Sequence, residues 1–129
     1  LMLCLDCGIT AFEPLAHARE HGLDVIVIDH HQGEALLPAA VAVVNPNRID
    51  EDSPCKQLAA VGVTFLTLIA TNTALKQADP TRALPPLLQW LDLVALGTVC
   101  DVMALRDVNR AFVVQGLKVL ALRQHTGLC

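Results

Sequence analysis

The sequence predicts an α/β fold in which a parallel sheet is flanked by helices. Apolar runs at 1–5 and 25–28 have the length of buried strands, and a helical segment separates them. Strands joined through a helix run parallel, so the first 31 residues are expected to form a strand-helix-strand unit. The 129 residues, 53% of them apolar, are sufficient for one domain with a buried core.

The elements of this first unit follow from local signals. The uninterrupted apolar run at 1–5 predicts a strand that is buried on both faces. Thr10 and Glu13 have the spacing of a capping box, which predicts the start of a helix. Gly22 is a natural end for that helix, and the second buried strand follows at 25–28.

A third strand is expected at 36–44, where Ala and Val are frequent, and Asn45-Pro46-Asn47 would end it. Residues 48–54 are polar and are expected to form a loop. From Lys56 onward the apolar period becomes helical. The residues expected on one face of this helix are Leu58, Val61, Phe65, Leu68 and Ile69. Gly62 within it is expected to permit close packing.

The last third of the chain is expected to be helical. A proline-containing linker at 78–86 precedes a helix that begins at Leu87 and ends at Gly97. A final helix is expected to begin near Asp107 or Asn109. No composition shift indicates a domain boundary.

Composition excludes several classes of protein. A net charge of −4 argues against a protein that grips nucleic acid through a basic surface of its own. No apolar stretch is long enough to predict a membrane span, so a cytoplasmic protein without membrane contact is expected. The cysteines are odd in number and scattered, as is typical of free thiols in a reducing compartment: Cys4, Cys7, Cys55, Cys100 and Cys129. Cys4 and Cys7 form a lone C-x-x-C, for which unligated thiols are expected.

Candidate functional residues stand where the predicted strands end. Asp6 follows the first strand, and Asp29-His30-His31 follows the second. Ligand sites of open α/β sheets lie at the carboxyl edge, so both groups are expected at one site. The alternative is that Asp29 caps the next segment and that both histidines are ordinary surface residues.

Asp6, His30 and Asp101 share one property, since each places a metal-ligating group at the end of, or within, an apolar segment. Burying a carboxylate is unfavourable unless a cation or hydrogen bonds compensate its charge. Carboxylates and imidazole together suit Mn²⁺, with Mg²⁺ as an alternative. Two such ions would activate a water molecule and stabilise the departing oxygen of a phosphate ester, although three ligands are too few for two ions.

Several motifs occur in the order and spacing of one family. They are Asp6-Cys7-Gly8-Ile9, Val25 to His31, Asn45-Pro46-Asn47, Leu58 to Val63, Gly97 to Leu105, Asn109-Arg110 and Gln115-Gly116-Leu117. On these motifs the chain resembles the DHH phosphoesterase domain of the RecJ-type single-strand-specific exonucleases. Two positions depart from the family pattern, because Cys7 replaces a usual Asn and Ala60 a common Gly.

The resemblance implies roles for individual residues. Asp6 would bridge two metal ions, and His30 and Asp101 would be ligands of one ion. His31 would face the substrate phosphate. Asp29 would not bind a metal ion itself but would orient the imidazoles. Arg110 and Lys56 are candidates for further phosphate contacts.

The implied function is 5′ to 3′ hydrolysis of single-stranded DNA by a two-metal exonuclease in DNA repair and recombination. The chain 1–129 would be a partial DHH domain, truncated at both ends. An Asp-x-Asp motif would precede it, and DNA-binding domains of the full-length protein would follow. The isolated chain is therefore expected to bind metal weakly and to lack nuclease activity. Repair proteins are the expected partners besides DNA. Alternatives are a DHH phosphodiesterase acting on short oligonucleotides or cyclic dinucleotides, and a scaffold that has lost catalysis.

Overall fold

A computed structural model of the chain describes residues 1–128. These residues fall into two compact units, the first comprising Leu1–Thr64 and the second beginning at Phe65. The helix α2 (Ala60–Ala78) contains the boundary between them.

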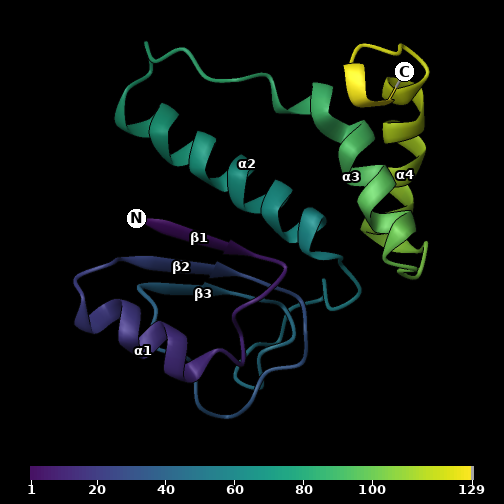
Figure 1. Ribbon diagram of the computed structural model, residues 1–129. Coiled ribbons are helices and arrows are strands. Elements are labelled where there is room, and N and C mark those ends of the chain that lie inside the picture. Colours follow the sequence, from purple (N-terminus) through teal and green to yellow (C-terminus); the bar gives the residue numbers. More distant parts are fainter. Residues whose placement is uncertain (129) are drawn as a thin grey trace. The chain divides into compact units, whose positions relative to one another are not determined.

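The first unit is built on a parallel sheet. Its strands are β1 (Met2–Leu5), β2 (Val25–Ile28) and β3 (Ala42–Val44), in the order β1-β2-β3. The helix α1 (Phe12–Glu20) connects β1 to β2 and covers one face of the sheet (Figure 1). The predicted α/β class with a parallel sheet is therefore confirmed.

The register aligns the carboxyl ends of the three strands. Leu5 of β1 pairs with Ile28 of β2, and Ile28 pairs with Val44 of β3. Because all three strands end at one level, the residues that follow them gather at one edge of the sheet.

The central strand and α1 supply the core of this unit. Val25 and Val27 are almost completely buried and pack with Leu15 of α1. Met2 and Cys4 of β1 pack against the same cluster, whereas Leu3 and Leu5 are exposed. The expectation that the first strand is buried on both faces is thus wrong. Side chains of a strand alternate between the two faces of the sheet, so Met2 and Cys4 point toward α1, whereas Leu3 and Leu5 point toward the opposite face.

The capping-box prediction is also wrong. Helix α1 begins at Phe12, after Ala11 in the N-cap position, and no side chain caps it. Thr10 lies one residue before the cap, so its spacing to Glu13 has no structural effect. The predicted end is correct, since Gly22 follows the last turn with a φ of 71°, which glycine adopts without strain.

The third strand is shorter than predicted. Only Ala42–Val44 pairs as a strand, and residues 36–41 are irregular. Pro38 in this stretch has no N–H to donate to a neighbouring strand, and Leu36 is 73% exposed. Asn45-Pro46-Asn47 follows β3 directly, as predicted.

Helix α2 begins at Ala60 rather than at Lys56. The prediction of its buried face is correct only for the first turns of the helix. Phe65 is 4% exposed, but Leu68 and Ile69 are each 39% exposed, so the second half of the helix presents apolar residues at the surface. A β-carbon on Gly62 would lie 3.0 Å from Leu58 Cδ2, which confirms the close packing expected there.

The second unit is helical. It contains the short 3₁₀ helices η1 (Leu87–Trp90) and η2 (Thr126–Leu128), with α3 (Leu91–Cys100) and α4 (Asp107–Leu120) between them. Helices α3 and α4 lie side by side in Figure 1. A β-carbon on Gly116 of α4 would lie only 2.2 Å from a backbone oxygen of α3, so a glycine there permits the close approach of the two helices.

Helix α3 continues beyond Gly97, contrary to prediction, because a Schellman motif sets its end. The Val102 N–H donates to Val99 O (3.0 Å), and the Met103 N–H donates to Thr98 O (3.2 Å). Val102 therefore has a φ of 54°, which is unfavourable for a β-branched residue. Asp101 becomes the C-cap residue at the start of this turn.

No helix among residues 1–128 is long and apolar enough to span a membrane.

Candidate metal centre at the carboxyl edge of the sheet

Asp6 leaves the sheet directly after β1. Its N–H still donates to Ile28 O (3.0 Å), which continues the ladder between β1 and β2 by one residue. Its φ of 63° then turns the chain, a conformation that Asp tolerates better than most residues. The side chain is 63% exposed and lies beside His30.

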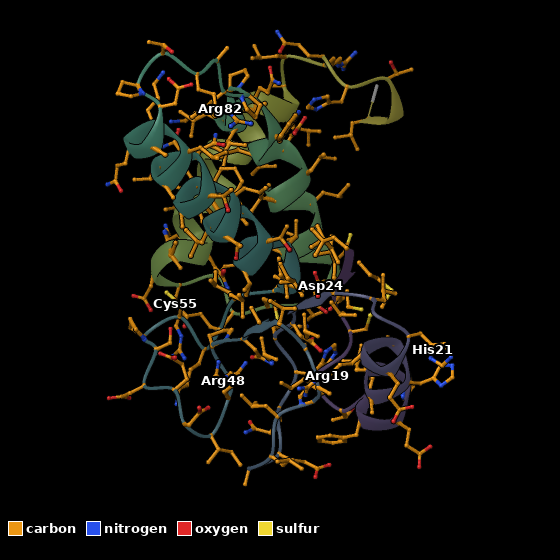
Figure 2. All side chains as sticks on the ribbon, turned by 90° about the vertical axis from the view of Figure 1, so that its left-hand side faces the viewer. Arg19, His21, Asp24, Arg48, Cys55 and Arg82 are labelled. Carbon is orange, nitrogen blue, oxygen red and sulfur yellow. The ribbon has the colours of Figure 1, made fainter. Side chains whose placement is uncertain are left out.

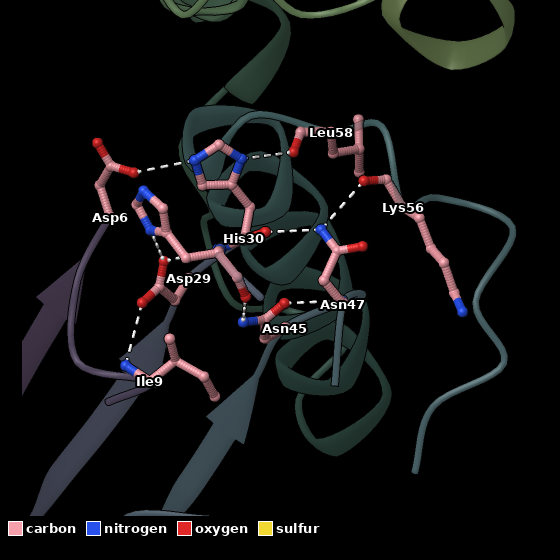
Figure 3. Close-up of polar contacts among 9 residues, drawn as sticks. Asp6, Ile9, Asp29, His30, Asn45, Asn47, Lys56 and Leu58 are labelled. Carbon is pink, nitrogen blue, oxygen red and sulfur yellow. Dashed lines mark hydrogen bonds and ion pairs between the residues drawn. The ribbon is translucent and has the colours of Figure 1, made fainter. Parts of the chain in front are cut away.

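His30 is held with a defined tautomer. Its Nδ1 lies 3.0 Å from Leu58 O, and a carbonyl oxygen only accepts, so Nδ1 carries the proton. In the neutral ring Nε2 is then a lone-pair donor, and it lies 3.3 Å from Asp6 Oδ1 (Figure 3). These two electron-rich atoms lie close enough to share a metal ion. The His30 side chain is only 9% exposed, so a charge shared there would be screened weakly by water.

His31 completes the cluster. Its Nδ1 lies 2.7 Å from Asp29 Oδ1, and its side chain is 58% exposed. Asp6, His30 and His31 each offer one ligand atom, and these atoms lie within 4.8 Å of one another. This arrangement of one carboxylate and two imidazoles fits a divalent first-row metal ion.

Asp29 lies beneath the cluster and is almost completely buried. Burial raises the pKa of its carboxyl group, but hydrogen bonds from the backbone N–H groups of Ile9, His30 and His31, and from the His31 ring, lower the pKa below its ordinary value. Asp29 therefore orients one imidazole, not both as the resemblance implied. The His30 ring is oriented by the Leu58 carbonyl.

Two asparagines hold the backbone of the His-His pair, and sequence reasoning assigned them only to the end of a strand. Asn45 Nδ2 donates to His31 O (2.9 Å). Asn47 Nδ2 donates to His30 O (2.6 Å) and to Lys56 O (3.1 Å), as Figure 3 shows. Their position directly after β3 could have indicated this role, because the carboxyl edge of a parallel sheet brings them beside the residues that follow β2.

The remaining predicted site residues are Lys56, Asp101 and Arg110. Lys56 is in the first unit, and its side chain extends away from His30 in Figure 3. Asp101 and Arg110 belong to the second unit, where both are exposed. Their roles stay predictions.

A cavity of about 300 Å³ lies at the opposite edge of the sheet, where β2 begins. Arg19 and Asp24, labelled in Figure 2, line it together with apolar residues and Gly22. Its lining contains no histidine or cysteine, so the carboxyl edge is the better candidate for a metal centre.

The parallel sheet and the Asp-His-His group at its carboxyl edge define the class of this protein. The model of the DHH family, N-terminal domain, matches residues 1–98, and the chain belongs to this family. Within it, the chain is similar to the single-stranded-DNA-specific exonuclease RecJ, as the sequence motifs predicted. Identity is 44% to RecJ of Escherichia coli and 36% to RecJ of Bacillus subtilis, over 100% and 99% of the chain.

Solved structures give the same result. A crystal structure of exonuclease RecJ bound to manganese matches 98% of the chain with a TM-score of 0.81 at 38% identity. A crystal structure of RecJ from Thermus thermophilus in complex with Mn²⁺ matches with a TM-score of 0.78, also at 38% identity. The chain spans 22% of the length of the Escherichia coli relative, and 31% and 18% of the two crystallised chains.

Proposed function

We propose that this chain forms part of the catalytic domain of an exonuclease that degrades single-stranded DNA from the 5′ end and uses Mn²⁺. One observation carries the proposal: the tautomer of His30 fixed by Leu58 O directs Nε2 at the Asp6 carboxylate. Similarity to RecJ over the whole length of the chain supports the substrate.

Asp6, His30 and Asp101 are the metal ligands in this proposal. The two that lie in the first unit fit the role, because His30 Nε2 and Asp6 Oδ1 are electron-rich and adjacent. Mn²⁺ is preferred and Mg²⁺ is the alternative. When bound, the metal ions polarise the phosphodiester group and lower the pKa of a water molecule.

The chain's own residues then orient the substrate and the ligands. Asp29 accepts the Nδ1 proton of His31, so Nε2 is the ring atom of His31 that faces a substrate phosphate, to which it donates a hydrogen bond when the ring carries both protons. Asp29 is a positioning residue in this scheme. Arg110 provides a second phosphate contact by virtue of its charge.

The chain is proposed to be one part of a DHH domain within a longer cytoplasmic protein. Its net charge of −4 leaves the binding of the DNA backbone to other parts of that protein. Single-stranded DNA is the proposed substrate, and DNA-repair proteins are the proposed partners.

The test is an exonuclease assay of the full-length protein with 5′-labelled single-stranded DNA and Mn²⁺. His30→Gln and Asp101→Asn are each expected to reduce the release of mononucleotides by more than about 10³-fold. Glu34→Gln, at an exposed carboxylate in the loop after His31, is the matched control and should retain wild-type turnover. If either ligand variant keeps its activity within about tenfold of wild type, the ligand assignment is wrong.

The same assay separates the alternatives. A protein that degrades only oligonucleotides a few nucleotides long would be a short-oligonucleotide phosphodiesterase. A protein without activity on either substrate, but with intact Mn²⁺ binding, would be a scaffold.

A further inference from the structure

Two histidines lie one turn apart at the C-terminal end of α1. His17 is in the last turn of the helix, and His21 is its C-cap residue. Residues four positions apart share one face of a helix, and the ring centroids of this pair are only 4.1 Å apart. Both residues are exposed, and Figure 2 shows the His21 ring on the outside of the helix. Because β2 begins at Val25, the pair lies near the edge where the strands begin, opposite the carboxyl edge.

The helix backbone fixes the orientation and the tautomer of the His21 ring. The backbone N–H of His21 donates to His17 O at 3.2 Å, and His21 Nδ1 lies 2.9 Å from the same oxygen. A carbonyl oxygen only accepts, so Nδ1 carries the proton. In the neutral ring Nε2 then presents a lone pair, which is the form in which histidine binds a metal ion. One ligand atom of the pair is thus already in its binding state.

The separation of the two rings suits one shared metal ion. Bonds from a metal ion to imidazole nitrogen are about 2.0–2.1 Å long, so two imidazoles at adjacent positions of one ion have ring centres roughly 4.5–5 Å apart. The rings of His17 and His21 are 4.1 Å apart and tilted by 43°, so they must separate by less than about 1 Å. Both side chains are exposed, and a small rotation about their bonds supplies this movement.

The charge around the pair favours a bound cation. The last carbonyl groups give the C-terminal end of a helix a partial negative charge. Arg19 stands two positions from each histidine, a spacing that does not share their face of the helix. The pair consists of imidazoles without a carboxylate, and such ligands favour Cu²⁺, Ni²⁺ and Zn²⁺ over Mn²⁺. Its chemistry therefore differs from that of the cluster around Asp6.

We propose that His17 and His21 form a second metal site, which takes late first-row divalent ions and binds Cu²⁺ most tightly. The two imidazoles occupy adjacent positions on the ion, and water molecules occupy the others. The bound ion joins residues 17 and 21 and so closes the last turn of α1. The site shares no residue with the cluster of Asp6, His30 and His31, so it does not depend on the proposed function.

The test titrates the full-length protein with the iminodiacetate complex of Cu²⁺ and follows binding by electron paramagnetic resonance. The chelator occupies part of the coordination sphere and leaves adjacent positions for two imidazoles. The wild-type protein is expected to show a Cu²⁺ signal with two imidazole nitrogens. His17→Gln and His21→Gln should each weaken binding at this site by at least about tenfold, because a chelate of two ligands becomes a single contact.

Two control variants locate the ion. Arg19→His combined with His21→Gln keeps two histidines on α1, but at a spacing that faces them apart, so it should not restore binding. His31→Gln removes one histidine from the carboxyl edge and should retain the site on α1. Equal Cu²⁺ binding by wild type and His21→Gln would overturn the proposal. Loss of the two-imidazole signal in His31→Gln but not in His21→Gln would also overturn it, because the ion would then lie at the carboxyl edge.

Hydrogen exchange followed by mass spectrometry measures the effect on the helix. With the Cu²⁺ complex bound, peptides that cover residues 17–23 should exchange at least about threefold more slowly, because the ion binds the closed turn and not the open one. His21→Gln should show no such slowing. Unchanged exchange in the saturated wild-type protein would overturn the closing of the last turn.

Discussion

His30 Nε2 lies 3.3 Å from Asp6 Oδ1, while His30 Nδ1 is committed to the Leu58 carbonyl at 3.0 Å. The contact with Leu58 fixes the proton on Nδ1 and thereby determines the state of Nε2. A ring whose Nδ1 must donate presents an Nε2 lone pair to the carboxylate, and this is the arrangement in which histidine binds metals. The candidate centre thus depends on a backbone carbonyl at the end of the loop before α2.

The Asp29 carboxylate is expected to stabilise both the fold and the orientation of His31. Asp29→Asn removes the charge and replaces one acceptor oxygen by a donor that faces other N–H groups. The expected loss in the free energy of unfolding is about 2–4 kcal/mol, since hydrogen bonds to a buried charged acceptor are involved. Urea denaturation measures it. Asp24→Asn, at an exposed position before the same strand, should change stability by less than about 0.5 kcal/mol. Equal effects of the two variants would contradict this role.

Asn47 is expected to fix the His30 backbone. Asn47→Ala removes the donor to both His30 O and Lys56 O. We expect a loss of about 1–3 kcal/mol in stability, together with weaker Mn²⁺ binding. Asn72→Ala is the matched control, because Asn72 also donates to a carbonyl but lies in the second unit. Loss of Mn²⁺ affinity in this control would contradict the role of Asn47.

Val102 is expected to be strained. Its φ of 54° in the Schellman turn is unfavourable for a β-branched side chain, and its side chain is 88% exposed, so packing offers little compensation. Val102→Gly should therefore raise the free energy of unfolding by about 1 kcal/mol, despite the greater flexibility of glycine in the unfolded chain. Val99→Gly, on the same helix, should destabilise by a similar amount. A destabilising effect of Val102→Gly would show that the turn is not strained.

Gly116 is expected to be intolerant of any side chain. A β-carbon there would lie 2.2 Å from Leu91 O and 2.4 Å from Ala95 Cβ, so α3 and α4 would have to separate. Gly116→Ala should lower the melting temperature and cost about 1–3 kcal/mol. Gly127→Ala has open space around the new methyl group and serves as the control. An unchanged melting temperature for Gly116→Ala would contradict the close packing of the two helices.

The sequence predicts the framework of the site well, because strand ends are strong signals. Apolar runs that stop at Asp6 and at Asp29 locate the carboxyl edge, and parallel pairing then brings these residues together. The sequence does not predict the role of Leu58, because Leu58 contributes a backbone carbonyl oxygen, which every residue possesses. Asn45 and Asn47 are similarly ambiguous, since asparagine after a strand is also an ordinary turn residue.

Helix boundaries are predicted less well where tertiary structure decides them. Gly97 is a typical helix end by composition, yet α3 continues to Cys100 because the Schellman bonds form around Val102. Thr10 and Glu13 have the spacing of a capping box. The backbone after Gly8, however, places Ala11 in the N-cap position, so the helix begins at Phe12. In both cases the backbone path overrides a local preference. Cys129 lies outside the described residues, so the prediction of free thiols is confirmed only for the other four cysteines.

The central claim is that Asp6 and His30 hold a metal ion, and Mn²⁺ affinity tests it most directly. Titration of the full-length protein, followed by the electron paramagnetic resonance signal of free Mn²⁺, compares wild type with His30→Gln and with His17→Gln, an exposed histidine of α1. We expect an affinity loss of about 100-fold or more for His30→Gln and none for His17→Gln. Equal Mn²⁺ affinity of wild type and His30→Gln would contradict it.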